Sequence, residues 1–134
     1  ALMKPSISII TIGVDDLERA FAFYRGLLEL PDDQIGAGED HVAFFFSDAF
    51  TFVLFPRTEI AATAGRDAAE PAAGGFVLSH RAGSATEVDE ILDRVLALGG
   101  TIVTPGTASE WGYSAYFEDS EGNLWELMGP PTAN

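Results

Sequence analysis

The sequence has 134 residues, of which seven are Lys or Arg and 21 are Asp or Glu, so its formal net charge is −14. This length fits a single globular domain, and a hydrophobic content of 47% is enough for a buried core. No cysteine is present, which excludes disulfides, thiolate metal ligands and cysteine nucleophiles. The acidic balance argues against binding to nucleic acid or anionic lipid, because both need a basic surface.

No apolar stretch approaches the ~20 residues that a membrane-spanning helix needs, so no membrane association is expected. Residues 1–6 do not resemble a secretory signal peptide, and we therefore expect a cytoplasmic protein. The negative charge is compatible with a cationic ligand, although acidic surfaces more often serve solubility.

The first half of the chain predicts a strand, a helix and a pair of strands. Residues 6–14 are rich in Ile, which indicates a mostly buried strand. Two Asp residues follow as a helix start, and apolar residues then recur at helical spacing until Pro31 ends the pattern. Residues 41–46 and 51–55 predict two strands whose short connection suits a hairpin.

The second half repeats this order after a change in composition. Residues 56–75 are dense in Ala with several Gly and Pro, which is typical of a flexible connector. Residues 76–80 predict a strand, and Ser84 with Glu87 has the S-x-x-E spacing of a helix N-terminus. The pair Gly99–Gly100 supplies the C-terminal stop of this helix. Three further strands are expected at residues 101–104, 113–118 and 124–128.

Two stretches of the sequence resemble a known family. Residues 9–18, I-I-T-I-G-V-D-D-L-E, and residues 119–127, D-S-E-G-N-L-W-E-L, resemble the opening and closing motifs of the glyoxalase/bleomycin resistance/extradiol dioxygenase superfamily, also called vicinal oxygen chelate. Ser120 stands where the closing signature, D-P-x-G-x-x-x-E-L, usually has Pro. The resemblance covers roughly residues 5–130.

The resemblance implies an α+β fold in which two tandem βαβββ modules form a curved mixed sheet around a central cavity. Module 1 would span residues 5–57 and module 2 residues 76–130, with a connector at residues 58–75. The fourth strand of module 1 is then expected within residues 31–40. Members of this family are commonly homodimers, so the resemblance also implies a homodimer.

Enzymes of this family hold a divalent metal ion with side chains from the strands that line the cavity. The resemblance places one ligand position at Ile9 and another near Phe76, and neither side chain can ligate a metal. A further position falls within residues 52–55, which contain no carboxylate or imidazole. Glu126 alone matches a ligand type, whereas catalytic zinc or iron needs about three protein ligands. We therefore expect no metal cofactor.

A divalent metal held away from these positions is the alternative. His41, His80 and Glu126 have the composition of a two-His-one-carboxylate iron site. His80 shares the alternation of Phe76 and Leu78 and could point into the cavity, whereas His41 begins a strand that is not a ligand strand of the family. The protein would then be a lyase or dioxygenase with Glu126 and His80 as catalytic residues, and the ion would polarise vicinal oxygens of the substrate.

Glu126 lies between Leu124 and Met128 on one face of its strand, where an acid is costly to bury without a partner. It could be a cavity carboxylate that accepts a cation or acts as a general base. It could equally be a structural acid that is paired with an Arg such as Arg57 or Arg81, or that faces solvent.

Aromatic residues supply the remaining ligand-binding candidates. Trp111 and Tyr113 precede a strand on a loop expected at the cavity mouth, where they could contact a ligand or serve rim packing or a dimer contact. Phe52 and Phe76 could stack on a flat ligand, although most Phe side chains around the first hairpin are expected in the core.

These observations favour metal-independent binding of a small aromatic or cationic molecule in the cavity. The first alternative is a metal-dependent enzyme that uses His41, His80 and Glu126, and the second is a partner-binding domain with a vestigial cavity. Metal analysis after purification without chelators distinguishes metal-independent binding from the metal-dependent enzyme.

Overall fold

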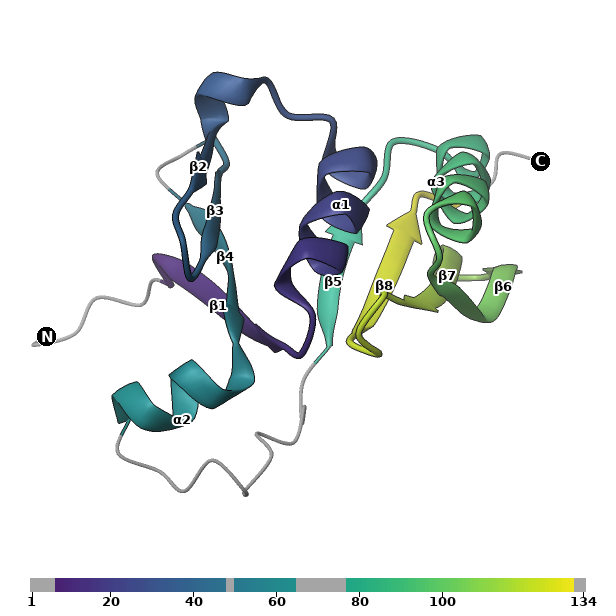
Figure 1. Ribbon diagram of the computed structural model, residues 1–134. Coiled ribbons are helices and arrows are strands. Elements are labelled where there is room, and N and C mark those ends of the chain that lie inside the picture. The colour runs from purple at the N-terminus through teal and green to yellow at the C-terminus, as the bar shows by residue number, and fades with distance from the viewer. Residues whose placement is uncertain (1–6, 48–49, 65–76, 132–134) are drawn as a thin grey trace, which may run out of the picture. The chain divides into compact units, whose positions relative to one another are not determined.

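The computed structural model of the chain describes residues 7–47, 50–64 and 77–131. The described strands form two separate four-stranded mixed sheets rather than one continuous sheet (Figure 1). The chain divides into two compact units, the first made of residues 1–21 and 29–72 and the second of residues 22–28 and 73–134. No helix within the described residues is long and apolar enough to cross a membrane.

The sheet of the first unit has the strand order β1-β4-β3-β2. Strand β1 (Ile9–Val14) runs parallel to β4 (Thr51–Pro56). Strand β4 pairs antiparallel with β3 (Val42–Phe45), which in turn pairs antiparallel with β2 (Ile35–Ala37). Strand β2 is the fourth strand that was expected within residues 31–40, so the first module has the predicted order of elements.

One face of this first sheet is the core of the first unit. Successive side chains along each strand point to this face and to the other face in turn. On this face, Phe44 and Phe52 stack with their ring centroids 6.1 Å apart. Phe21, from the first turns of α1 (Leu17–Leu28), packs against Phe44 at 6.2 Å. The fully buried residues of this face include Ile12, Val14, Phe44, Phe52 and Leu54.

The segment predicted as a flexible connector begins with a helix. Helix α2 (Arg57–Ala64) follows β4 directly, which fits the high helix propensity of Ala. Arg57 Nε donates a hydrogen bond to Asp15 Oδ1 at 3.1 Å, so the first turn of α2 is joined to the end of β1. The rest of the predicted connector, residues 65–75, lies outside the described residues.

The sheet of the second unit repeats the same order as β5-β8-β7-β6. Strand β5 (Leu78–Arg81) runs parallel to β8 (Leu124–Gly129). Strand β7 (Gly112–Glu118) pairs antiparallel with β8 and with β6 (Thr101–Ser109). Strand β6 is longer than predicted because its pairing with β7 continues past two irregularities in register.

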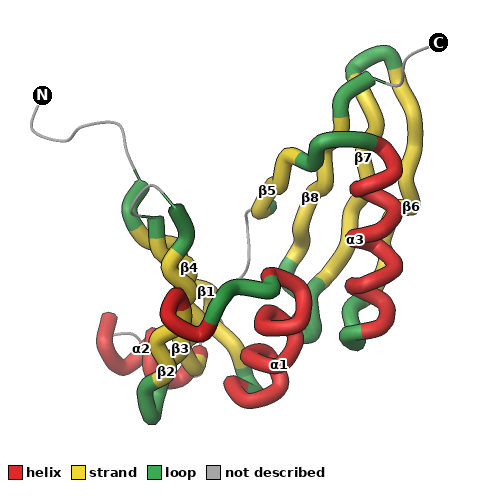
Figure 2. The backbone as a smooth tube through the Cα atoms, turned by 90° about the horizontal axis from the view of Figure 1, so that it is seen from above, coloured by secondary structure: helices red, strands yellow, loops and turns green. Residues whose placement is uncertain are grey.

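Helix α3 (Ala85–Ala97) lies along one face of the second sheet (Figure 2). Its start has the predicted capping arrangement: Ser84 Oγ accepts from the backbone N–H of Glu87 at 3.1 Å, and the Glu87 carboxylate accepts from the N–H of Gly83 at 2.7 Å. The helix ends at Ala97, with Leu98 as its C-cap, and the following Gly99 has a φ of 92°, which favours glycine. The helix side chains buried against the sheet are Val88, Leu92 and Val95.

The turn between β7 and β8 is organised by the buried carboxylate of Asp119, which is 4% exposed. Asp119 accepts hydrogen bonds from the backbone N–H groups of Glu121 and Asn123 and from the Asn123 side chain. It also accepts one from the hydroxyl of Tyr24, to which Trp125 Nε1 donates at 3.0 Å. The Asp and Asn of the closing motif are therefore structural residues that fix the hairpin carrying β8.

Candidate functional site

Glu126 lies on the face of the second sheet that α3 leaves uncovered. Side chains alternate along β8, so the neighbouring Leu127 points to the other face, where it is 1% exposed. Across the sheet, Glu126 is paired with Ser79 on β5 and with Tyr116 on β7. Paired residues share a face, so the three polar side chains form one row across adjacent strands.

Both oxygens of the Glu126 carboxylate accept hydrogen bonds from this row. Ser79 Oγ donates to Oε1 at 2.9 Å, and the Tyr116 hydroxyl donates to Oε2 at 2.9 Å. The hydrogen bond to Glu126, with the negative charge of that carboxylate, raises the pKa of Tyr116 above its ordinary value of 10.0. Tyr116 therefore keeps its proton and remains a donor at neutral pH. Hydroxyl groups, rather than Arg57 or Arg81, satisfy this acid.

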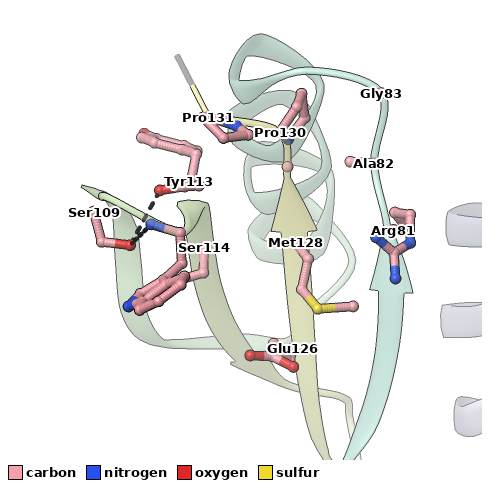
Figure 3. A pocket seen from close by; sticks show the side chains of 13 residues that line it. Arg81, Ala82, Gly83, Ser109, Tyr113, Ser114, Glu126, Met128, Pro130 and Pro131 are labelled. Carbon is pink, nitrogen blue, oxygen red and sulfur yellow. Dashed lines mark hydrogen bonds between the residues drawn. The ribbon is translucent and has the colours of Figure 1, made fainter.

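Glu126 also lines a pocket in the second unit with a volume of about 620 Å³ (Figure 3). The wall is built from β5 and the loop after it, the β6–β7 hairpin, and β8 with the two prolines that follow it. Arg81 and Glu126 bring opposite charges to this wall, and Met128 brings an apolar surface. The volume is within the range of sites that bind small organic molecules.

Trp111 and Tyr113 both line the pocket, but they contribute differently. The Trp111 side chain is 85% exposed at the turn between β6 and β7, and its backbone N–H donates to Ser109 Oγ. The Tyr113 hydroxyl donates instead to Asp89 on α3, at 2.8 Å. The geometry therefore supports Trp111 as a group that a ligand can reach, whereas the polar end of Tyr113 is engaged elsewhere.

His80 does not share the face of Glu126. It is paired with Leu127, so it lies on the opposite face of the sheet, although its alternation with Phe76 and Leu78 predicted that it could point into the cavity. His41 belongs to the first unit, where its Nδ1 lies 2.7 Å from Asp40 Oδ1. Among the residues that the structure describes, no group of three His, Cys, Asp or Glu side chains is placed to hold a metal ion.

The two Phe candidates have different outcomes. Phe52 is 2% exposed and lies in the core of the first unit, so its expected role as a ligand contact is replaced by a packing role. Its position on β4 explains this, because Phe52 is in register with the buried Phe44 of β3. Phe76 lies outside the described residues.

Comparison with known proteins identifies the family. The model of the Glyoxalase/Bleomycin resistance protein/Dioxygenase superfamily matches residues 6–127. The chain belongs to this superfamily. Among curated proteins, none matches the sequence significantly.

Several solved structures share the fold of this glyoxalase-superfamily chain. A glyoxalase-related enzyme from Fulvimarina pelagi has a TM-score of 0.83 at 22% identity, over 94% of this chain and 88% of that one. A glyoxalase/bleomycin resistance protein from Albidiferax ferrireducens has a TM-score of 0.69 at 28% identity, over 93% and 98% of the two chains. A lactoylglutathione lyase from Agrobacterium tumefaciens has a TM-score of 0.67 at 25% identity, over 94% of each.

The row around Glu126 does not fit the metal site expected of a glyoxalase-superfamily enzyme. It offers one carboxylate and two hydroxyls, from Ser79 and Tyr116. Catalytic zinc and non-haem iron are held by about three His, Cys or carboxylate ligands. The donor set therefore supplies one strong ligand and no second one.

The corresponding row of the first sheet is even less polar. Val53 is the third residue of β4, as Glu126 is the third residue of β8, and it is paired with Thr11 and Ala43. None of these three side chains is a carboxylate or an imidazole. The residue that corresponds to Ser79 is thus Thr11, which lies two positions after Ile9 on the same face of β1.

Sequence reasoning missed Ser79 and Tyr116 as partners of Glu126. Tyr116 could have been found from the turn, because a hairpin pairs residues that are equally distant from its centre, here Glu121. No comparable feature of the sequence indicates that Ser79 lies beside Glu126. Its place depends on the parallel register between β5 and β8, which are separated along the chain by α3, β6 and β7.

Proposed function

We propose that this protein binds a small aromatic or cationic organic molecule in the pocket beside Glu126, without the help of a metal ion. The observation that carries the proposal is the carboxylate of Glu126 on the pocket wall, held by Ser79 and Tyr116. A carboxylate has about four acceptor positions, of which these hydroxyls use two. The remaining positions are available to an ammonium, amidinium or amide N–H of a ligand.

The apolar part of the pocket suits the rest of such a ligand. Trp111 offers an indole face that is largely exposed, and aromatic faces attract both flat rings and cations. The thioether of Met128 also packs well against aromatic rings. A ligand that covers Trp111 removes its apolar surface from water, which favours binding.

The net charge of −14 adds a long-range attraction for cations. Salt screens this attraction, because the Debye length falls to about 10 Å at 0.1 M ionic strength. We therefore expect cationic aromatic compounds to bind more tightly at low salt than at high salt.

Two measurements on the same preparation test this proposal. The protein is purified without chelators, its metal content is measured by mass spectrometry, and benzylamine is titrated while amide chemical shifts are followed by NMR. We expect much less than one metal ion per chain. We also expect benzylamine to shift the amides of residues 79–83, 109–114 and 124–129, which contain every residue of the pocket wall except its two prolines.

A charge-matched pair of variants assigns the binding to Glu126. Glu126→Gln is expected to weaken benzylamine binding by about tenfold or more, because a charge-assisted hydrogen bond is lost. Glu90→Gln removes the same charge from an exposed position on α3 and is expected to leave affinity within about twofold. Equal losses in the two variants contradict the proposal. A stoichiometric metal that disappears in Glu126→Ala contradicts it too, and favours the metal-dependent lyase or dioxygenase.

A further inference from the structure

We infer that the ligand of this pocket is amphoteric and carries a carboxylate for Arg81 in addition to a cationic group for Glu126. This inference rests on the proposed function, since it concerns the second charged group of the same ligand. It depends on the register of two neighbouring strands, β5 and β8, and on the hydrogen-bond partners of the Arg81 side chain.

Arg81 and Glu126 lie on one face of the sheet at neighbouring positions. Ser79 is paired with Glu126, and Arg81, two residues further along β5, is paired with Met128. With ~3.3 Å per residue along a strand and ~4.8 Å between strands, the Cα atoms of Arg81 and Glu126 are about 8 Å apart. Figure 3 shows Arg81 on one strand of the pocket wall and Glu126 and Met128 on the next.

The Arg81 guanidinium has no protein partner in residues 7–47, 50–64 and 77–131, whereas the carboxylate beside it is satisfied by hydroxyls. Arg57 of the first unit differs from Arg81, because Arg57 forms an ion pair with Asp15. The wall of the pocket therefore presents a positive and a negative group side by side that do not neutralise each other. A guanidinium offers donors in a planar fork that matches the two oxygens of a carboxylate.

Ligands with one sign of charge satisfy only one of these groups. A cationic ligand that pairs with Glu126 brings its positive charge near Arg81, which opposes binding. An anionic ligand that pairs with Arg81 meets Glu126 and the net charge of −14. A ligand with both groups satisfies both sites and has no net charge for the acidic protein to repel.

The two charged groups on the pocket wall define a simple set of compounds. 4-(Aminomethyl)benzoate carries its ammonium and its carboxylate at opposite ends of one aromatic ring. Benzylamine keeps the ring and the ammonium, and 4-methylbenzoate keeps the ring and the carboxylate. The three compounds thus separate the contribution of each charge from that of the ring.

The test is a set of NMR titrations of these compounds at low salt. We expect 4-(aminomethyl)benzoate to bind about tenfold or more tightly than either single-charge compound, because a bidentate Arg–carboxylate pair is added. Arg81→Gln is expected to abolish this advantage while leaving benzylamine binding equal or tighter. Arg81→Lys keeps the charge but loses the fork, and an intermediate affinity is expected. Arg94→Gln, at an exposed position on α3, is the charge-matched control and is expected to change nothing.

The outcomes separate this inference from the proposed function. If benzylamine binds through Glu126 but the added carboxylate gives no gain, or if Arg81→Gln and Arg94→Gln behave alike, the amphoteric ligand is wrong and the proposed function stands. If none of the three compounds shifts the pocket amides, the proposed function fails, and this inference fails with it.

Discussion

The hydroxyl of Tyr24 donates a hydrogen bond to Oδ2 of Asp119, with 2.5 Å between the two oxygens, although the two residues are 95 positions apart in the sequence. Both residues belong to the second compact unit, because this unit includes residues 22–28 of α1. The end of α1 is thereby joined to the turn that precedes β8. The stability of this unit is expected to depend on the hydrogen bond between Tyr24 and Asp119.

Asp119→Asn is expected to lower the free energy of unfolding by about 2–3 kcal/mol, because an amide nitrogen replaces an acceptor and leaves buried donors unsatisfied. Urea unfolding followed by circular dichroism measures the change. Asp93→Asn, at an exposed position on α3, is the control and is expected to change stability by less than about 0.5 kcal/mol. Similar unfolding midpoints for the two variants contradict the structural role of Asp119.

The pKa of Tyr24 predicts a loss of stability in alkaline solution. Burial, followed by the charge of Asp119 and the hydrogen bond to it, raises this pKa well above the ordinary value of 10.0. Tyr24 therefore keeps its proton in the folded chain at pH values where the unfolded chain loses it. Its contribution is fully present below pH 10 and declines as the pH rises above 10, by up to about 1.4 kcal/mol per pH unit.

Tyr24→Phe removes this titration, so its unfolding free energy should decline less steeply than that of the original protein above about pH 10. Urea unfolding at a series of pH values measures both slopes. Parallel curves for the variant and the original protein would show that Tyr24 does not cause the alkaline loss.

The pKa of Tyr116 reports on the carboxylate of Glu126. The hydrogen bond and the negative charge of Glu126 raise this pKa, so Glu126→Gln should lower it toward 10.0. NMR titration of tyrosine ring carbons measures the shift. Tyr113 is the internal control, since its own raised pKa comes from Asp89. It should respond to Asp89→Asn and not to Glu126→Gln; the reverse result contradicts the assigned hydrogen bonds.

Ser120 offers a test of the turn itself. Its hydroxyl is buried with no hydrogen-bond partner in the described part of the chain, and it occupies the second position of the turn closed from Gly122 N–H to the Asp119 carbonyl. Ser120→Ala should leave stability unchanged or raise it by up to about 1 kcal/mol. Ser120→Pro, which restores the residue usual in the closing signature, should add about 0.4–1 kcal/mol because Pro suits this turn position. Thermal unfolding measures both, and a lower midpoint for either variant contradicts the prediction.

Features that depend on neighbouring residues could be predicted from the sequence. The start of α3 follows from Ser84 and Glu87 because a helix cap is a local hydrogen-bond arrangement. The order of strands and helices followed from hydrophobic periodicity and from the two motifs of the family. The Ala-rich segment after β4 was the exception, since its Gly and Pro residues, which stand later in the segment, obscured the helix propensity of its first turns.

The arrangement of side chains around Glu126 could be predicted only in part. Alternation correctly separates Glu126 from Trp125 and Leu127, because it compares residues within one strand. It does not relate His80 on β5 to Glu126 on β8, because that needs the register between two strands joined through other elements. A shift of one residue in register exchanges the faces, and the observed pairing places Ser79 beside Glu126.

The two hydroxyls that hold Glu126 have a consequence for the thermodynamics of binding. Because neighbouring strands restrain the carboxylate before a ligand arrives, the ligand meets a preorganised charge and does not have to restrict a rotamer-rich side chain, which otherwise costs about 0.5–1.5 kcal/mol. The side chain of Trp111, at the tip of a hairpin, is 85% exposed and makes no hydrogen bond to any of the residues described. The side-chain conformational entropy that the protein loses on binding is therefore expected to be smaller at the cationic end of a ligand than at its aromatic ring.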